Sequence, residues 1–241
     1  MSKPEPSKSQ ARLDAETARI REAYARRQCG ELYSWFNPAH LFIMQERERR
    51  VLGLFKKLGL TRLSGLNILE VGCGEGNWLM ELVKWGARPE RLTGVDILPD
   101  RLTLARRVAA PGVGLVLANG VSLPFPAGIF DIVLQSMAFT SILDPAMKQA
   151  VAREMLRVVK PSGLILWYDY FVDNPWNPDV KGVRKGEIRR LFPGCRVEVK
   201  RITLAPPLAR LLAPYSYLLC YLLEKLRVLN THYLGTIRPR P

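Results

Sequence analysis

The chain has 241 residues, 48% of them apolar and 24% charged, so it can bury one sizeable core like an ordinary globular domain. Its four cysteines are scattered and its two histidines stand far apart. We therefore expect no metal site and no disulfide framework, and a reducing compartment such as the cytoplasm. The apolar run 211–223 is shorter than the roughly 17 to 25 residues of a spanning helix, which argues against a transmembrane helix there.

The net charge of +14 is unevenly distributed along the chain. Residues 61–180 hold 11 basic and 12 acidic side chains, whereas residues 1–60 hold 12 and 7, and residues 181–241 hold 13 and 3. An excess of basic residues on the flanks is typical of an anionic partner, such as nucleic acid, an acidic lipid surface or a phosphorylated substrate. It is equally typical of a surface that only keeps the protein in solution.

Residues 1–60 are expected to form a tail and a helical lid. Residues 1–10 are polar and carry two prolines, which predicts a disordered tail. Helix-forming residues fill 11–29, with Gly30 as the stop, and a second amphipathic pattern fills 38–58.

From residue 66 onward, apolar strands alternate with helices, which is the pattern of a parallel sheet covered on both faces. The predicted strands are 67–71, 91–96, 114–118, 129–135 and 163–170, and the predicted helices are 77–86, 100–110 and 146–158. Two further runs, 196–204 and 231–237, would complete the sheet. The fold class is α/β, in one domain over 61–241.

The segment 205–229, between the last two predicted strands, is expected to form a helical cap. Leu211, Tyr215 and Leu218 follow helical spacing, while Pro214 argues against one long regular helix. Three interpretations stay open for this segment: an ordinary packed helix, an apolar wall of a substrate site, or a helix in a membrane interface. Basic neighbours beside an apolar stripe favour the last of these.

The most informative stretch is 67–78, which predicts a buried strand, a turn with three glycines and the start of a helix. Gly72, Gly74 and Gly76 remove the Cβ atoms at alternate positions, so the backbone can bend tightly and a ligand can approach its amides. In an open α/β sheet such a turn lies beyond the carboxyl end of a strand, where small ligands bind. Asn77 replaces the third glycine of the G-x-G-x-x-G pattern, which argues against a nicotinamide or flavin site.

Further motifs follow in a fixed order. The second strand ends in Asp96, whose carboxylate can accept both hydroxyls of a ribose. Next come the segments 118–126, 130–135 and 155–169. Together with the glycine turn, these segments resemble the class I S-adenosylmethionine-dependent methyltransferases, and within them the branch that methylates small molecules. The resemblance covers about 66–170.

This resemblance implies a Rossmann-like, seven-stranded and mostly parallel sheet with helices on both faces and an antiparallel last strand. It also implies S-adenosyl-L-methionine as the cofactor. The positions that match the cofactor-binding residues of the family are Glu70, Gly72, Gly74, Gly76, Asp96, Ile97, Asn119, Gly120 and Gln135. Tyr24 and Tyr33 are further candidates, because an N-terminal lid would close over the cofactor there.

By the same resemblance, Asp96 would hold the ribose hydroxyls, Ile97 would pack on the adenine, and Glu70 would serve the glycine turn and the cofactor ammonium. Gln135 would face the methionine end. Relatives commonly have an Asp where this chain has Asn119, whose side-chain oxygen can still accept a hydrogen bond from the adenine amino group. The Asn-Gly pair also favours a simple turn.

No catalytic base stands out. Many relatives place a histidine just after the fourth strand, but the segment 138–144 contains none. Of the two histidines, His40 and His232, the second falls in the predicted last strand and suits a structural role. Asp169 is the catalytic acid–base candidate, because the carboxyl end of the fifth strand should face the substrate. The fourth strand is not followed by an Asn/Asp-Pro-Pro-Tyr/Phe motif, which argues against amino-group methylation of nucleobases.

The leading hypothesis is a cytoplasmic enzyme that methylates a hydroxyl or amine of a lipid-like, glycan or specialised-metabolite acceptor. The acceptor would be apolar or anionic, and peripheral contact with the inner face of a membrane is an alternative location. The basic flanks favour RNA methylation as a second hypothesis, although no RNA-binding appendage is visible. The missing histidine motivates a third, a cofactor-binding partner or membrane-associated protein without turnover. The oligomeric state is not predicted.

Overall fold

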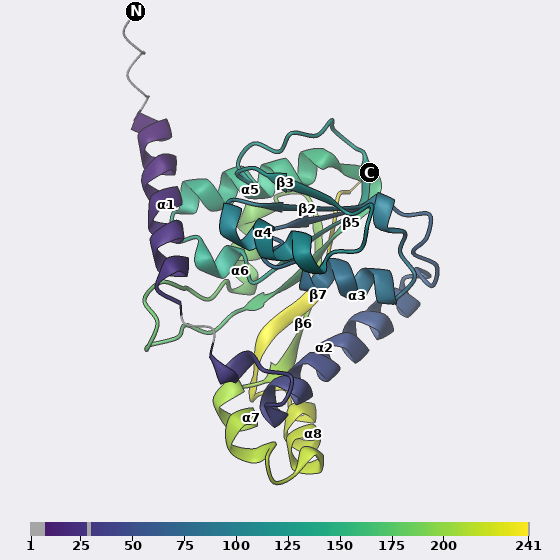
Figure 1. The fold of residues 1–241 in the computed structure, drawn as a ribbon, viewed down its shortest axis with the longest axis vertical. Coiled ribbons are helices and arrows are strands. Elements are labelled where there is room, and N and C mark those ends of the chain that lie inside the picture. Colours follow the sequence, from purple (N-terminus) through teal and green to yellow (C-terminus); the bar gives the residue numbers. More distant parts are fainter. Residues whose placement is uncertain (1–7, 28–29, 241) are drawn as a thin grey trace, which may run out of the picture.

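The computed structural model describes residues 8–27 and 30–240 (Figure 1). The helices are α1 (Lys8–Ala25), α2 (Pro38–Lys57), α3 (Asn77–Lys84), α4 (Pro99–Val108), α5 (Pro145–Val158), α6 (Lys185–Leu191), α7 (Pro206–Leu212) and α8 (Tyr217–Lys225). Three single turns of 3-10 helix are η1 (Glu31–Tyr33), η2 (Pro89–Arg91) and η3 (Phe139–Ser141). The strands are β1 (Ile68–Val71), β2 (Leu92–Asp96), β3 (Gly114–Leu117), β4 (Phe130–Ser136), β5 (Val159–Tyr170), β6 (Arg196–Leu204) and β7 (Asn230–Arg238).

The strands form one sheet in the order β3-β2-β1-β4-β5-β7-β6. Strands β1 to β5 pair in parallel, whereas β7 pairs antiparallel with both β5 and β6. The predicted Rossmann-like fold with an antiparallel last strand is confirmed. The strand order reverses between β1 and β4, and ligands of open α/β sheets bind beyond the carboxyl ends of the strands at such a point.

Helices cover both faces of the sheet (Figure 1). Helices α2, α3 and α4 pack on one face, where Val51, Leu79 and Leu102 belong to one apolar core. Helices α1, α5 and α6 pack on the other, where Ile20 and Val151 belong to a second core. Right-handed crossovers explain this division, because the chain moves from β1 to β3 in one direction across the sheet and from β4 to β5 in the other.

A third and smaller core lies beyond the carboxyl end of β6, where α7 and α8 form a helical hairpin against the start of α2 (Figure 1). Cys220 of the hairpin and Phe42 of α2 are buried in it. The predicted cap is therefore two short helices. They are separated at Pro214, and the Ser216 hydroxyl caps α8 by accepting a hydrogen bond from the Leu219 amide.

The largest differences from the predicted elements are at helices. Helix α1 begins at Lys8 and ends at Ala25, so it starts inside the predicted tail, and the rest of that tail lies outside the described residues. Helix α6 is not among the predicted elements, because its seven residues are too few to show a helical period. None of the helices in the described part of the chain combines the length and apolarity needed to cross a bilayer.

Candidate cofactor site

Strand β1 leads into the glycine turn 72–76. Gly72, Gly74 and Gly76 have φ angles of 78°, 53° and 80°. Other residues rarely adopt such positive values, so glycine is required at each position. The amides of Gly72 and Cys73 donate to the Val95 carbonyl at 2.8 and 3.0 Å, which ties the turn to the end of β2.

Asp96, the last residue of β2, is hydrogen-bonded directly to the glycine turn. Its Oδ2 accepts a hydrogen bond from the Gly74 amide at 2.7 Å, and its Oδ1 accepts one from the Leu98 amide at 2.9 Å. Each carboxylate oxygen keeps a further lone pair for a hydroxyl donor. The acid and the turn that sequence analysis paired therefore form one structural unit.

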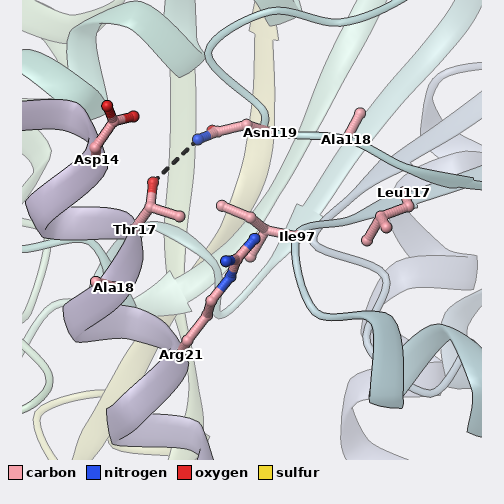
Figure 2. A pocket seen from close by; sticks show the side chains of 8 residues that line it. All are labelled: Asp14, Thr17, Ala18, Arg21, Ile97, Leu117, Ala118 and Asn119. Carbon is pink, nitrogen blue, oxygen red and sulfur yellow. Dashed lines mark hydrogen bonds between the residues drawn. The ribbon is translucent and has the colours of Figure 1, made fainter. Parts of the chain in front are cut away.

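A cavity of about 480 Å³ lies beside this unit, within the range of roughly 300–1,000 Å³ that is usual for small-ligand pockets. Helix α1 forms one wall and the segments after β2 and β3 form the other (Figure 2). The lining residues are Asp14, Thr17, Ala18, Arg21, Ile97, Leu117, Ala118 and Asn119. Asn119 Nδ2 donates to Thr17 Oγ1 at 3.1 Å, and Asn119 Oδ1 accepts from the Val121 amide at 3.2 Å. Asn119 therefore lines the pocket and also closes the turn that its Asn-Gly pair favours.

Replacing Asn119 by Ala should weaken binding of S-adenosylhomocysteine about tenfold, because a buried adenine amino group would lose its acceptor. Asn119→Asp should keep most of the affinity, since a carboxylate oxygen can take the same bond. Isothermal calorimetry measures both effects. Thr17→Val is the control, because it removes the bond from Asn119 to α1 and the Thr17 hydroxyl's own bond to the Leu13 carbonyl, but keeps the Asn119 oxygen. An equal loss in that variant would contradict the adenine assignment.

Among the buried polar side chains near the turn, Gln135 and Glu70 each have an atom without a hydrogen-bond partner. Gln135, at the end of β4, accepts from the Ala138 amide through Oε1, but its Nε2 donor is unpaired. Glu70 Oε2 is likewise unpaired, and burial raises the pKa of Glu70 well above its usual range, with Arg47 opposing this. Buried polar atoms are normally hydrogen-bonded. These residues fit a ligand that brings an ammonium and a carboxylate, and an ammonium would favour the charged form of Glu70.

Arg101 is a site residue that sequence analysis missed. Its guanidinium lies against the glycine turn, since a Cβ on Gly74 would be 3.3 Å from Arg101 Nε, and it pairs with Glu75 at 3.2 Å. The same guanidinium lies 5.0 Å from the centroid of the Tyr24 ring. Arg101 therefore links Tyr24 of α1 to the turn, and contact of Tyr24 with the cofactor remains a prediction.

Gly120 and Tyr33 make no hydrogen bond to the glycine turn or to Asp96 within the described structure. A Cβ on Gly120 would approach Val151 to 3.3 Å and Val71 to 3.4 Å, so this glycine lets the loop after β3 pack closely on the sheet. The Tyr33 ring is more than half exposed and meets the His40 ring edge-on at 5.9 Å. Its contact with the cofactor remains a prediction.

Asp169 is fully buried on the face of the sheet that carries α5. Its Oδ2 accepts from the Phe139 and Thr140 amides at 3.1 and 3.2 Å, and its Oδ1 accepts from the Tyr170 amide at 2.9 Å. Burial raises the pKa of Asp169 to about 7, and the hydrogen bonds to Thr140 and Tyr170 oppose this. The carboxylate thus fixes η3 beside the end of β4, and its predicted catalytic role remains a prediction.

His232 of β7 stacks on the Tyr168 ring at 5.0 Å and lies 4.0 Å from the Tyr170 ring. Burial, with Arg47 nearby, lowers the pKa of His232 from 6.5 to about 3. The His232 imidazole is therefore neutral in the folded protein down to about pH 3, whereas in the unfolded chain it becomes protonated below about pH 6.5.

His232 should make folding stability pH-dependent. Its contribution is fully present above pH 6.5 and is lost as the pH falls toward 3, by about 1.4 kcal/mol per pH unit. Denaturant unfolding at pH 7 and pH 5 measures this, with His232→Gln as the reference that lacks the group. If both proteins lost the same stability between the two pH values, His232 would not be buried as a neutral ring.

Within residues 8–27 and 30–240, no group of three or more His, Cys, Asp or Glu side chains is placed to hold a metal ion. A family profile described as a methyltransferase domain matches residues 68–163, which contain the glycine turn, Asp96, Asn119 and Gln135. Residues 68–163 are therefore a methyltransferase domain of the class I S-adenosylmethionine-dependent kind. S-adenosylmethionine is the cofactor of this family, and the unpaired atoms of Glu70 and Gln135 fit its methionine end.

Curated relatives are similar over about half of the chain. A demethylmenaquinone methyltransferase of Listeria monocytogenes is 29% identical over 133 residues, which is 54% of this chain and 54% of the relative. Phthiotriol/phenolphthiotriol dimycocerosates methyltransferase 1 of Mycobacterium ulcerans is 34% identical over 124 residues, 50% of this chain and 44% of the relative. The chain thus spans about half the length of these relatives.

Similarity to solved structures extends over the whole methyltransferase fold. The crystal structure of the [4+2]-cyclase SpnF aligns with a TM-score of 0.61 at 16% identity, covering 99% of both chains. At this identity the similarity shows the fold alone. Because that neighbour is named for a cyclisation, the fold by itself does not decide which reaction the site performs.

Proposed function

We propose that this chain transfers the methyl group of S-adenosylmethionine to a hydroxyl or amine of a small, lipid-like acceptor. The observation that carries the proposal is the 2.7 Å bond between Asp96 and the Gly74 amide, beside the unpaired buried atoms of Gln135 and Glu70. The lipid-like class is motivated by relatives named for demethylmenaquinone and for phthiotriol dimycocerosates.

The main role of the protein's own residues would be to bind the cofactor and to orient the acceptor toward its methyl group. When bound, the cofactor supplies an electrophilic methyl group on a sulfonium. Alignment of the acceptor atom with that group can lower a barrier by roughly 7–11 kcal/mol. Asp96 and the glycine turn would hold the adenosyl part, while Gln135 and Glu70 would hold the methionine part. Asp169 would act as a positioning residue by fixing η3, because its carboxylate is enclosed.

The acceptor would lie beyond Gln135, at the carboxyl ends of β4 and β5. Tyr170 ends β5 beside His232, and burial, with the neighbouring Tyr33, raises the pKa of Tyr170 to about 12, while Arg210 opposes this. Tyr33 precedes α2 and Arg210 belongs to α7. The start of α2 and the α7–α8 hairpin would therefore border the acceptor.

Two measurements test the proposal. Calorimetry should show binding of S-adenosylmethionine and S-adenosylhomocysteine to the folded chain. Incubation with methyl-labelled S-adenosylmethionine and separate quinone, sterol, phenol and glycolipid acceptors should then move label into an organic-soluble product. Cofactor binding with no transfer to any acceptor class would contradict the proposed reaction and favour a protein without turnover. Label found in RNA would contradict the acceptor class.

A further inference from the structure

Helices α7 and α8 and the segment before α2 form one end of the molecule (Figure 1). These segments expose many large apolar side chains. Phe36 is 98% exposed and Tyr215 is 87% exposed. The other exposed apolar residues of these segments are Leu32, Tyr33, Trp35, Leu211, Tyr217, Leu218, Leu219, Tyr221, Leu222, Leu226 and Val228. Single exposed apolar residues need no explanation, but a large group on neighbouring segments marks a surface for a partner or a membrane.

This exposure is not a sign that the hairpin is loosely attached. Its inner side packs in the third core, where Ala209 and Cys220 are fully buried. Tyr217 Oη donates to the Pro38 carbonyl at 3.1 Å, and the Tyr217 ring lies 5.9 Å from that of Phe42. One apolar side of the hairpin is therefore packed against the protein, and a second apolar side faces solvent.

The exposed charged side chains of the hairpin are all basic. Arg210, Lys225 and Arg227 are exposed, and the Lys225 ammonium lies 4.4 Å from the centroid of the Tyr221 ring. Glu224 is the one acid of the sequence between residues 205 and 229. It is buried and paired with Arg50 of α2, so it does not offset these bases at the surface.

We propose that this end of the protein, hereafter the docking surface, binds the interface of an anionic lipid bilayer. Aromatic and leucine side chains would enter the boundary between head groups and acyl chains, and the three basic residues would meet acidic head groups. The charge pattern selects this occupant, since the hairpin exposes three bases and no acid, and Glu31 before α2 is the one exposed acid of these segments. An apolar protein partner or a second copy would not need this excess of exposed bases. Binding there would let a lipid-like acceptor enter the site from the bilayer; that link alone rests on the proposed function.

Flotation of the full chain with vesicles tests the proposal. The chain should bind phosphatidylcholine vesicles that contain phosphatidylglycerol, and should bind much more weakly to pure phosphatidylcholine or at high salt. Replacing Arg210, Lys225 and Arg227 by Gln should weaken binding roughly fivefold for each base removed. Tyr215→Ser with Leu218→Ser should weaken it on the order of tenfold for each residue. These side chains are exposed, so the variants should fold.

Helix α4 offers a matched control on another part of the surface. Arg106→Gln, Arg107→Gln and Val108→Ser change exposed residues of the same kinds and should leave vesicle binding unchanged. Equal losses in the control and hairpin variants would overturn the proposal. So would absence of vesicle binding by a chain that binds S-adenosylhomocysteine, or a dimer in light scattering that the hairpin variants disrupt. Loss of cofactor binding with intact vesicle binding would instead count against the proposed function alone.

Discussion

Asp96→Ala should weaken binding of S-adenosylhomocysteine at least about 100-fold. The substitution removes the acceptor for both ribose hydroxyls, and hydrogen bonds to a charged group contribute about 1.5–3 kcal/mol each. It also leaves the Gly74 and Leu98 amides without their partner, so the glycine turn loses the bond that fixes it. Isothermal calorimetry with S-adenosylhomocysteine gives the dissociation constant directly.

Two variants separate the ribose role of Asp96 from the support of the turn. Asp96→Asn keeps one oxygen acceptor for the Gly74 amide, so it should bind the cofactor with intermediate affinity. Asp100→Ala removes an exposed carboxylate from the first turn of α4, and should leave the affinity unchanged. An unchanged dissociation constant for a folded Asp96→Ala protein would refute the cofactor site.

Strands β1 and β2 could be predicted because they are mostly buried apolar runs that end at Gly72 and Asp96. Strand β6 and its antiparallel neighbour were also predicted, since Arg196 to Leu204 alternates polar and apolar residues. Strand β5 begins four residues earlier than the predicted Gly163. Residues Val159 and Leu164 pair with Phe130 and Ile132 across a register shift, which no local pattern encodes. Residues 159–162 belong to no predicted element.

The site was predictable where one continuous motif builds it, as with the glycine turn and Asp96. Thr17 and Arg21 could not be predicted, because their place depends on how α1 docks against loops a hundred residues away. Arg101 could have been predicted, since it follows Asp96 by five residues and lies in the first turn of α4, the helix that follows the acid. For Asp169, strand alternation is visible in the sequence, but nothing local says which face carries α5.

Gly235→Ala should destabilise the protein by at least about 3 kcal/mol, although alanine is no worse than glycine in an average strand. Gly235 lies in β7 between Trp167 of β5 and Val199 of β6. An added Cβ would come within 1.9 Å of the Glu198 carbonyl oxygen and 2.6 Å of the Val199 Cα. These are backbone atoms, so the clash cannot be relieved by a side-chain rotation. Denaturant unfolding followed by circular dichroism measures the loss.

Gly53→Ala is the control for this prediction, because it makes the same chemical change in a different setting. Gly53 lies inside α2, and a Cβ there would meet no atom within 4 Å. The substitution should therefore stabilise the protein by about 0.5–1 kcal/mol through helix propensity. Opposite signs for the two variants would show that close approach of β6 and β7 requires Gly235. Because β6 leads directly into α7, the Gly235 variant should also lose vesicle binding as the hairpin detaches, whereas Gly53→Ala should retain it.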